Sequence, residues 1–356
     1  MKKKHLILLL LVLAASLTLS ACTGSRFQTT SWPGITIFED DLFVAQGQRI
    51  YQIDPTNGAE LTRIPRETDA KSPTYFAPPV ITEDGQLFIG SYNNNLYTYN
   101  INNGTENWMF ANDNRFIASV LLVDEMIYAP NADHTLHALN MSGTEQWSFE
   151  TEGPLWAKPV YDGEKLYLAS MDHHLYALNH KTGNEIWSID LGGTTVTSPE
   201  ISEDGVLYLG TFESEVLAIR SSNGVEVWSF QANDWIWAPP ALVDDIIYAT
   251  DISGWLYALE ADTGKLLWNF KGEGQVSGTP LVTEDGVYIG TGDGNFYALD
   301  LEGKLRWNRF YKEDSLLLGV PVLAGEFVIV PVSGVEAILV AYDANGTIQW
   351  EFVPGN

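Results

Sequence analysis

The chain has 356 residues, 45% hydrophobic and 12% aromatic, with 19 Lys and Arg against 46 Asp and Glu. This apolar content excludes intrinsic disorder, and the length allows one large all-β domain or two ordinary domains. A formal charge of -27 repels phosphate backbones and anionic lipid headgroups, so we expect no nucleic-acid partner. The one cysteine permits no internal disulfide and no zinc site built from several thiolates.

Residues 1–21 are predicted to be a signal peptide. A basic head, Met1–His5, precedes the apolar run Leu6–Ala15 and a small, mildly polar end. A membrane-spanning anchor is the alternative, but the stretch Leu6–Cys22 has only 17 residues, which is short for a bilayer core of about 30 Å.

The predicted signal peptide ends in Leu19, Ser20, Ala21 and Cys22, a string that resembles the lipobox of bacterial lipoproteins. The resemblance implies that Cys22 carries a diacylglyceryl group, that cleavage falls before it, and that the new N-terminus is acylated. Two or more acyl chains give a stable membrane anchor. Residues 22–32 are then a lipidated tether. An ordinary signal peptide with an incidental cysteine is the alternative.

From residue 33 onward a unit of about 40 residues recurs eight times. Residues 175–187 and 256–268 show it most clearly, because both read Leu-Tyr-Ala-Leu, then Thr-Gly, then Trp. One marker position recurs at intervals of 39 to 46 residues, at Tyr51, Tyr97, His137, Tyr176, Leu217, Tyr257, Tyr297 and Val340. A period of about 40 to 45 residues is typical of a four-stranded propeller blade.

Each unit reads as four short strands, which in the fourth repeat are residues 159–161, 165–169, 174–178 and 185–189. No 3.6-residue apolar pattern follows the signal peptide, so the fold is predicted to be all-β. Radial closure removes exposed sheet edges. We therefore predict a single eight-bladed β-propeller of four-stranded blades over residues 33–356, each blade made from one contiguous repeat. A strand from residues 26–32 across the last blade is an additional way to close the ring.

A tryptophan occupies one slot in seven of the eight copies, and Thr62 takes its place in the first. These residues are Trp108, Trp147, Trp187, Trp228, Trp268, Trp307 and Trp350. The string Ala-Leu-Asp/Glu-x-x-Thr-Gly-x-x-x-Trp, as in residues 258–268, resembles the repeat of pyrroloquinoline-quinone (PQQ)-type propellers. The resemblance covers residues 33–353 and implies that each tryptophan docks between adjacent blades.

The PQQ-type family contains quinoprotein dehydrogenases and cofactor-free lipoproteins resembling BamB. Quinoprotein alcohol dehydrogenases hold the quinone against a disulfide of adjacent cysteines, above Ca²⁺ and beside an Asp base, whereas this chain has one cysteine and compact repeats. Its resemblance is therefore to the BamB branch. That branch implies a non-enzymatic scaffold with no PQQ and no calcium. A PQQ-dependent dehydrogenase is an alternative, because glucose dehydrogenases of the family lack the disulfide, and a surface-anchored ligand- or carbohydrate-binding propeller is another.

The BamB resemblance also implies partners and a location. The partners are envelope proteins, such as the barrel-assembly machinery or unfolded outer-membrane proteins. We expect the lipid anchor to hold the protein at the outer membrane facing the periplasm, or at the outer face of the cytoplasmic membrane if the organism lacks an outer membrane.

Aromatic residues gather where the chain enters the first strand of a blade, beside the expected central channel. A proline recurs at the start of that strand, with Ser119 aligned to it in the third copy, and four of the eight positions three residues earlier are aromatic. Exposed aromatic side chains are frequent contact hot spots. We predict a binding funnel made of Phe76, Phe116, Trp156, Trp235 and Trp237; the alternative is that these side chains fill the packing between blades.

No catalytic residue and no metal site are predicted. His134 and His173 occupy equivalent turns of adjacent blades, next to Asp133 and Asp172, where they would either bind a transition metal or be solvated turn residues. The Asp-Gly turns lack the carboxylate spacing of a calcium loop.

Overall fold

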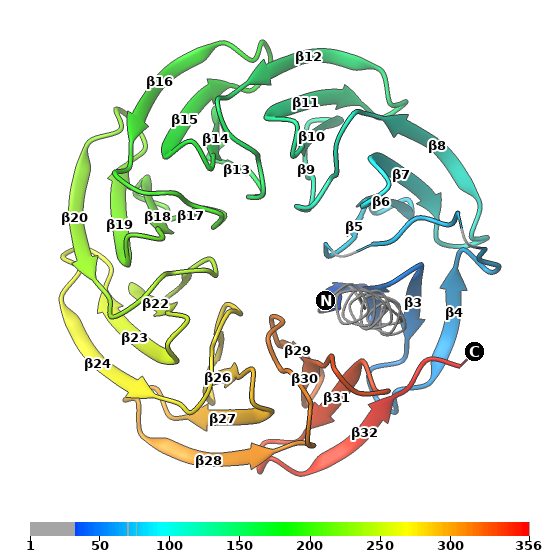
Figure 1. The fold of residues 1–356 in the computed structure, drawn as a ribbon, viewed down its shortest axis with the longest axis vertical. Helices are drawn as coiled ribbons and strands as arrows, with labels where there is room; N and C mark the ends of the chain where they lie inside the picture. Colours follow the sequence, from blue (N-terminus) through cyan, green and yellow to red (C-terminus); the bar gives the residue numbers. More distant parts are fainter. Residues whose placement is uncertain (1–32, 70, 76, 356) are drawn as a thin grey trace, which may run out of the picture. The chain divides into compact units, whose positions relative to one another are not determined.

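Eight sheets of four strands each are arranged in a ring, and together they form an eight-bladed β-propeller (Figure 1). The structure is a computed structural model, and it describes residues 33–69, 71–75 and 77–355. The predicted signal peptide, Cys22, the tether and Phe76 lie outside the described residues. The predicted fold class is confirmed: the described residues form strands and no helix, and so include no helix able to cross a membrane.

Each blade takes its strands from one contiguous stretch of chain. Blades one to four consist of β1 (Gly34–Phe38), β2 (Asp41–Gln46), β3 (Arg49–Ile53) and β4 (Glu60–Ile64); β5 (Val80–Ile81), β6 (Gln86–Gly90), β7 (Asn95–Asn100) and β8 (Glu106–Ala111); β9 (Leu121–Val123), β10 (Met126–Pro130), β11 (Thr135–Asn140) and β12 (Glu145–Glu150); and β13 (Val160–Tyr161), β14 (Lys165–Ala169), β15 (His174–Asn179) and β16 (Glu185–Asp190). Blades five to eight consist of β17 (Glu200–Ile201), β18 (Val206–Gly210), β19 (Glu215–Arg220) and β20 (Glu226–Gln231); β21 (Ala241–Val243), β22 (Ile246–Thr250), β23 (Trp255–Glu260) and β24 (Leu266–Lys271); β25 (Leu281–Thr283), β26 (Gly286–Gly290), β27 (Asn295–Leu299) and β28 (Leu305–Phe310); and β29 (Val322–Ala324), β30 (Phe327–Pro331), β31 (Leu339–Tyr342) and β32 (Ile348–Phe352).

The strands of a blade are antiparallel and run outward in chain order, so the first strand lies beside the central channel and the fourth at the rim (Figure 1). The middle strands are covered on both faces by the adjacent blades, and β14 and β15 are therefore buried almost throughout. The fourth strand alternates between exposed and half-buried positions, as in β16, because only one of its faces meets a neighbour. Eight hydrophobic clusters fill the eight blade interfaces.

A β-bulge recurs at the same place in all eight blades, between the third and fourth strands. In blade four, Ala177 pairs with Trp187 while Leu178 pairs with Glu185, which leaves Ile186 as the extra residue. A bulge twists its strand and re-aims the neighbouring side chain. The bulge therefore stands directly before the tryptophan slot.

The tryptophan of one blade lies over a glycine in the turn between the third and fourth strands of the next. A Cβ added to Gly264, whose φ is +69°, would stand 2.5 Å from Cε3 of Trp228. The Trp228 indole also donates a 2.7 Å hydrogen bond to the carbonyl oxygen of Ala261. The same packing recurs at seven interfaces, pairing Trp108 with Gly143, Trp147 with Gly183, Trp187 with Gly224, Trp228 with Gly264, Trp268 with Gly303, Trp307 with Gly346, and Trp350 with Gly58.

The ring closes between blade eight and blade one by this same contact. The Trp350 indole donates to the carbonyl oxygen of Pro55 at 2.9 Å, and one hydrophobic cluster joins Leu42 and Val44 to Ile329 and Leu339. All eight sheets are complete without a strand from residues 26–32, which lie outside the described residues.

At the interface between blades one and two, Thr62 occupies the slot that holds a tryptophan in the other blades. Three tyrosines pack together at this interface: Tyr75 lies edge-on against Tyr97 and Tyr99, and the hydroxyls of Tyr75 and Tyr99 lie 2.7 Å apart. Burial raises the pKa of Tyr99 to about 12 and that of Tyr75 well above its ordinary range. The hydroxyl pair therefore stays neutral inside the core.

The missing tryptophan provides a matched test of the docking contact. Gly104 has a φ of +73° like Gly264, but a Cβ there would meet only Ile64, at 3.8 Å. Alanine strains the backbone at both positions, by about 1 kcal/mol. At Gly264 it also displaces an indole ring, which adds about 1 to 3 kcal/mol. Urea unfolding should find Gly264→Ala less stable than Gly104→Ala by that increment; equal losses would show that the ring can move at little cost.

Candidate functional site

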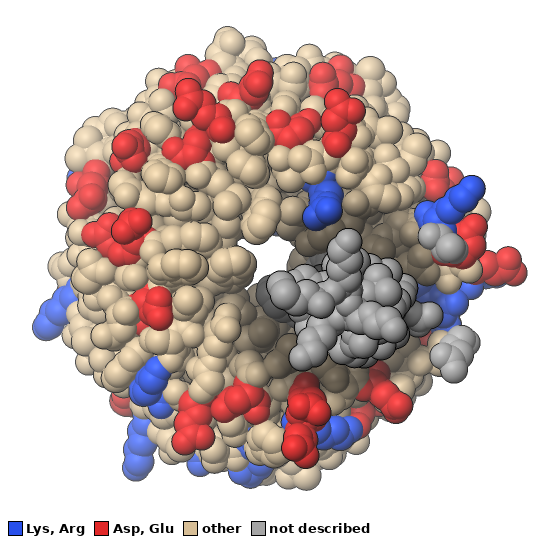
Figure 2. Space-filling view, viewed as in Figure 1, with Lys and Arg blue, Asp and Glu red and all other residues tan. Residues whose placement is uncertain are grey.

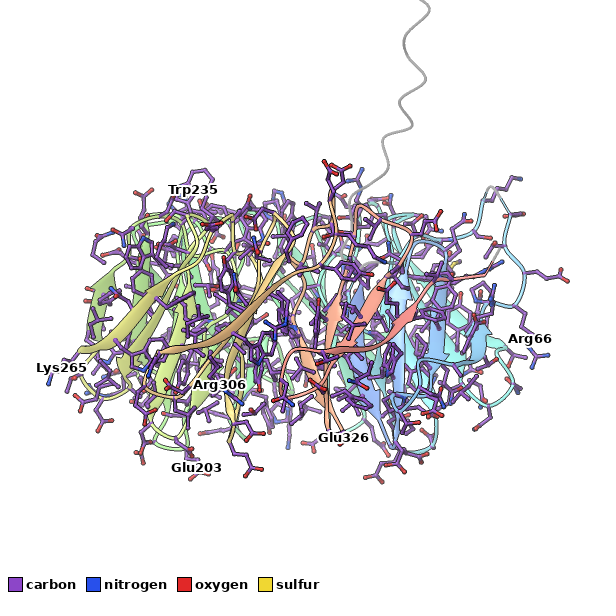
Figure 3. The ribbon with its side chains drawn as sticks, turned by 90° about the horizontal axis from the view of Figure 1, so that it is seen from below. Arg66, Glu203, Trp235, Lys265, Arg306 and Glu326 are labelled. Carbon is purple, nitrogen blue, oxygen red and sulfur yellow. The ribbon has the colours of Figure 1, made fainter. Side chains whose placement is uncertain are left out.

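The two faces of the disc carry different side chains. The turns between second and third strands, and the links from each fourth strand to the next blade, form one face, here called the mouth face; residues 211–215 and 232–240 are examples. Trp235 stands on the mouth face, and Glu203 and Glu326 stand on the opposite face (Figure 3). On the mouth face the side chains around the channel opening are mostly neutral, and acidic side chains lie farther out (Figure 2).

The opposite face is acidic around the whole ring. Every hairpin between a first and a second strand carries at least one carboxylate. One from each blade is Glu39, Glu83, Asp124, Glu164, Glu203, Asp244, Glu284 and Glu326. Such a face repels acidic partners, whereas Trp156 and Trp235 are exposed on the mouth face, so the mouth face is the better candidate for a contact surface.

A cavity of about 410 Å³ lies where the central channel meets the mouth face. The cavity is lined by five of the residues that stand three positions before the recurring proline. They are Trp156, Val196, Trp237, Ser277 and Leu318. The Trp156 side chain is 36% exposed. The cavity has the size and apolar lining of sites that hold a small ligand or a few side chains of a partner.

The prediction that Phe116 lines this mouth is wrong. Its ring is 2% exposed and packs in the core between blades two and three. Leu121 in β9 pairs with Tyr128 as Val160 in β13 pairs with Tyr167, so Val120, and not Ser119, is equivalent to the recurring proline. A shift of one residue moves a side chain to the other face of a strand. Ile117 lines the cavity instead.

Three aromatic rings are stacked at the mouth face. Phe212, from the turn between β18 and β19, lies parallel to Trp235 and to Trp237, with ring centroids 5.2 Å apart in both pairs and interplanar angles of 16° and 11°. Trp237 lines the cavity, and Trp235 is 47% exposed. The stack therefore leads from the cavity wall to the surface of the mouth face. Sequence reasoning missed Phe212, because the ring comes from a different blade than the two tryptophans.

The cavity wall holds a lysine among small and apolar side chains. Burial lowers the pKa of Lys158, and the Glu200 carboxylate of the next blade opposes that shift. Burial also raises the pKa of Glu200. Ser277, on the same wall, has a buried hydroxyl that lacks a hydrogen-bond partner. The wall thus offers an ammonium group and a hydroxyl for which the described residues supply few contacts.

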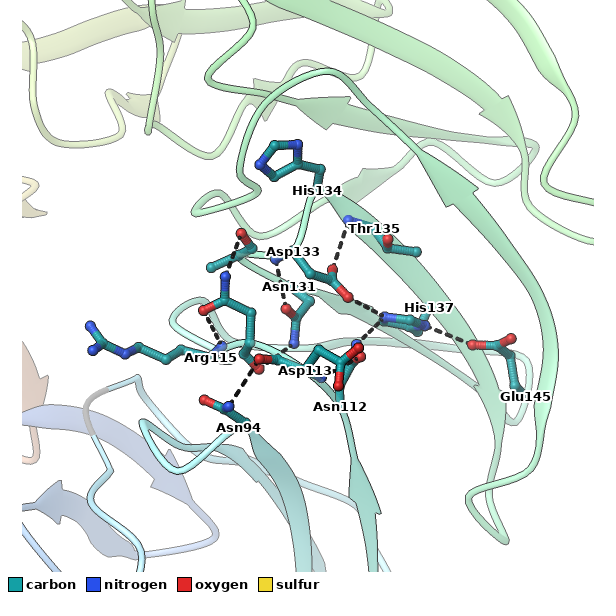
Figure 4. A network of polar contacts seen from close by, with 12 residues as sticks. Asn94, Asn112, Asp113, Arg115, Asn131, Asp133, His134, Thr135, His137 and Glu145 are labelled. Carbon is teal, nitrogen blue, oxygen red and sulfur yellow. Dashed lines mark hydrogen bonds and ion pairs between the residues drawn. The ribbon is translucent and has the colours of Figure 1, made fainter.

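The histidines do not form a metal site in the described part of the chain, which has no group of three or more His, Cys, Asp or Glu side chains able to hold a metal ion. The polar cluster of this region is centred on the buried His137 (Figure 4). Its Nδ1 lies 2.6 Å from Glu145 Oε2, and its Nε2 lies 2.5 Å from Asn112 Nδ2 and 3.7 Å from Asp133 Oδ2. His134 stands apart from this cluster (Figure 4).

A family model described as outer membrane protein assembly factor BamB matches residues 46–156, 140–235 and 212–353. None of the curated proteins matches the chain. The crystal structure of BamB from Moraxella catarrhalis is similar, with a TM-score of 0.70, 17% identity, and coverage of 88% of this chain and 94% of that one. The computationally designed protein Ika8 is similar with a TM-score of 0.72 and 12% identity, over 91% of this chain and 96% of its own. Likeness at these identities shows the fold alone.

The lowered pKa of Lys158 predicts a stability effect with a defined pH dependence. Because the folded protein binds this proton less tightly than the unfolded chain, the charged side chain destabilises the fold, and that cost disappears as pH rises towards the ordinary lysine pKa. Lys158→Met should therefore be more stable than the native protein near pH 7, with a gap that narrows towards pH 10.5. Unfolding curves at several pH values test this, with Lys181→Met in an exposed turn as the control. A gap that stays constant with pH, or a less stable variant, would contradict it.

Proposed function

Because the chain belongs to the family of outer membrane protein assembly factor BamB, we propose that it is a non-enzymatic scaffold that binds other envelope proteins in the assembly of outer-membrane β-barrel proteins. The mouth face is the contact surface in this proposal. The partners are components of the barrel-assembly machinery or unfolded outer-membrane proteins. The same proposal places Cys22 in a lipid anchor, at the outer membrane facing the periplasm or, in a cell without one, at the outer face of the cytoplasmic membrane.

The observation that carries the proposal is that the tryptophans fall into two groups, one packed between blades and one at the mouth of the channel. Seven of them pack between blades, against glycines. Trp156, Trp235 and Trp237 lie instead at the mouth of the channel or on the face around it, and two of the three are more than one-third exposed. Large aromatic side chains held on a rigid surface supply contact area at a small entropic cost, which is why they dominate binding hot spots.

The rim offers a second way to hold an extended segment. The fourth strand of every blade is the end strand of its sheet and lies at the rim (Figure 1). Several side chains of the fourth strands are apolar and exposed, among them Phe310 and Val227. An extended segment can add to such an edge through main-chain hydrogen bonds, while its side chains contact the exposed apolar groups.

The absence of catalysis, of PQQ and of calcium is part of the proposal. The chemistry of the cavity wall supports the absence of calcium, since that wall offers the Lys158 ammonium group and hydroxyls within an apolar surface. A calcium ion prefers several carboxylate and carbonyl oxygens. The alternative of a ligand- or carbohydrate-binding propeller shares the same aromatic mouth and differs in what is captured.

Site-specific cross-linking in the native host tests the proposal. A photoactivatable amino acid at position 237 should link to a component of the barrel-assembly machinery, identified by mass spectrometry. The same amino acid at position 326, on the acidic face, is the matched control and should capture little. Equal capture from both faces, or cross-links only to proteins unconnected with barrel assembly, would contradict the proposal.

Removing the mouth tryptophans should separate binding from folding. The double variant Trp156→Ala and Trp237→Ala should lower capture of that component at least tenfold. Because Trp156 is partly exposed and Trp237 loses one ring stack, the free energy of unfolding should fall by no more than about 2 kcal/mol. A much larger loss of stability would show that these rings serve packing between the blades.

A further inference from the structure

The outer end of the aromatic stack is rigid and open to solvent. Trp235 has one ring face against Phe212 and is 47% exposed on the mouth face (Figure 3). Backbone hydrogen bonds fix the segment, since Ile252 donates to the carbonyl oxygen of Trp235 at 3.0 Å and Ile236, which is fully buried, donates to that of Thr211 at 3.1 Å. A planar group that binds here meets a surface that is already ordered, so little entropy is lost.

The chain itself places an arginine at the equivalent position of another blade pair. Tyr92 and Arg115 stand in blades two and three where Phe212 and Trp235 stand in blades five and six, because the carbonyl oxygens of Arg115 and Trp235 each accept a 3.0 Å hydrogen bond from the turn of the blade that they lead into. The Arg115 guanidinium lies 5.1 Å from the centroid of the Tyr92 ring. This face of the fold is thus suited to stacking a guanidinium on an aromatic ring.

A lysine also stacks on an aromatic ring of this face, within blade six. The Lys271 ammonium group lies 5.7 Å from the centroid of the Trp255 ring. In blades five and six the Trp235 indole itself occupies the position of the Arg115 guanidinium and stacks on Phe212. The exposed indole extends the aromatic surface outward, and no lysine or arginine among the described residues lies over its ring.

Two carboxylates lie next to the stack along the chain. Glu213 follows Phe212 and is exposed. Asp234 precedes Trp235, and its Oδ1 accepts the backbone N–H of Trp235 at 2.9 Å. Neither carboxylate forms an ion pair with a described residue. The segments that carry Phe212 and Trp235 thus hold carboxylates and no basic residue from position 211 to 215 or from 232 to 237, in a chain whose overall charge is -27.

We propose that Trp235, with Glu213 and Asp234, binds an arginine side chain of a partner protein. The guanidinium stacks on the indole ring, where its flat shape and weak hydration favour it over lysine, and the two carboxylates balance its charge. The inference rests on the proposed function and adds the chemistry of the partner: the segment held at the mouth face carries arginine beside its apolar residues.

Calorimetric titration with a defined peptide tests the proposal on the purified protein at 150 mM salt. The probe is an acetylated and amidated hexapeptide of alternating glycine and arginine. Counterparts with lysine or with citrulline replace only the basic side chain. The arginine peptide should bind at least threefold more tightly than the lysine peptide and at least tenfold more tightly than the citrulline peptide.

Variants separate the stacking site from attraction to an acidic protein in general. Trp235→Leu and Glu213→Gln should each weaken binding of the arginine peptide at least fivefold. Trp255→Leu and Glu152→Gln are the matched controls, because they remove an aromatic ring and an exposed carboxylate elsewhere on the mouth face, and they should leave the affinity unchanged. Far-UV circular dichroism establishes that each variant is folded before titration.

Three results would overturn the inference. They are equal binding of the arginine and citrulline peptides, binding that is unaffected by Trp235→Leu, and Trp235-dependent binding of maltohexaose in place of the arginine peptide, which would indicate a carbohydrate site. Cross-linking from position 237 tests the proposed function separately. Its success together with failure of the peptide titration would overturn only the arginine site.

Discussion

The contact between a tryptophan and a glycine of the next blade is the constraint on which the rest of the structure depends. Neighbouring blades are connected by short links, so their relative position is set by what packs between them. The indole fills the space that a Cβ would occupy, and at six of the seven positions its N–H donates to a carbonyl of the neighbouring blade at 2.7 to 3.1 Å. At the seventh position the Trp147 N–H lacks this bond. The carbonyl oxygen of His180, which is the equivalent acceptor, accepts a 2.8 Å hydrogen bond from the Tyr128 hydroxyl. The packing of indole on glycine thus recurs at all seven positions, and it persists at Trp147 without the hydrogen bond.

This repeated contact frees the mouth face for other chemistry. Because the docking residues lie in the fourth strands and in the turns of the opposite face, the links and turns of the mouth face vary between blades without disturbing the ring. Blade five supplies Phe212, the link into blade six supplies Trp237, and the link into blade four supplies both Trp156 and Lys158. The eight acidic hairpins make the other face unlike this one. A partner meets apolar rings around the channel on the mouth face, with carboxylates farther out, and a ring of carboxylates on the opposite face.

The fold followed from the sequence because its signal is periodic. The tryptophan slot, the turn glycines and the recurring tyrosine agree on one spacing in nearly every copy. The site followed less well, since it depends on single residues. The third repeat lacks the recurring proline, so the sequence favours Ser119 for that position, which is one residue too early. The same shift predicts that the buried Phe116 lines the cavity, where Ile117 does so. Phe212 had no signal at all, because a stack between two blades is a relation between residues more than twenty positions apart.

The free energies of unfolding of two tryptophan variants, measured in urea under the same conditions, test the central claim that docking tryptophans hold the ring while surface tryptophans are available for binding. Trp228→Ala removes a buried ring and should cost about 3 to 5 kcal/mol. Trp235→Ala removes a half-exposed ring with one stacking partner and should cost no more than about 1.5 kcal/mol. Equal losses, or a larger loss for Trp235→Ala, would contradict the account.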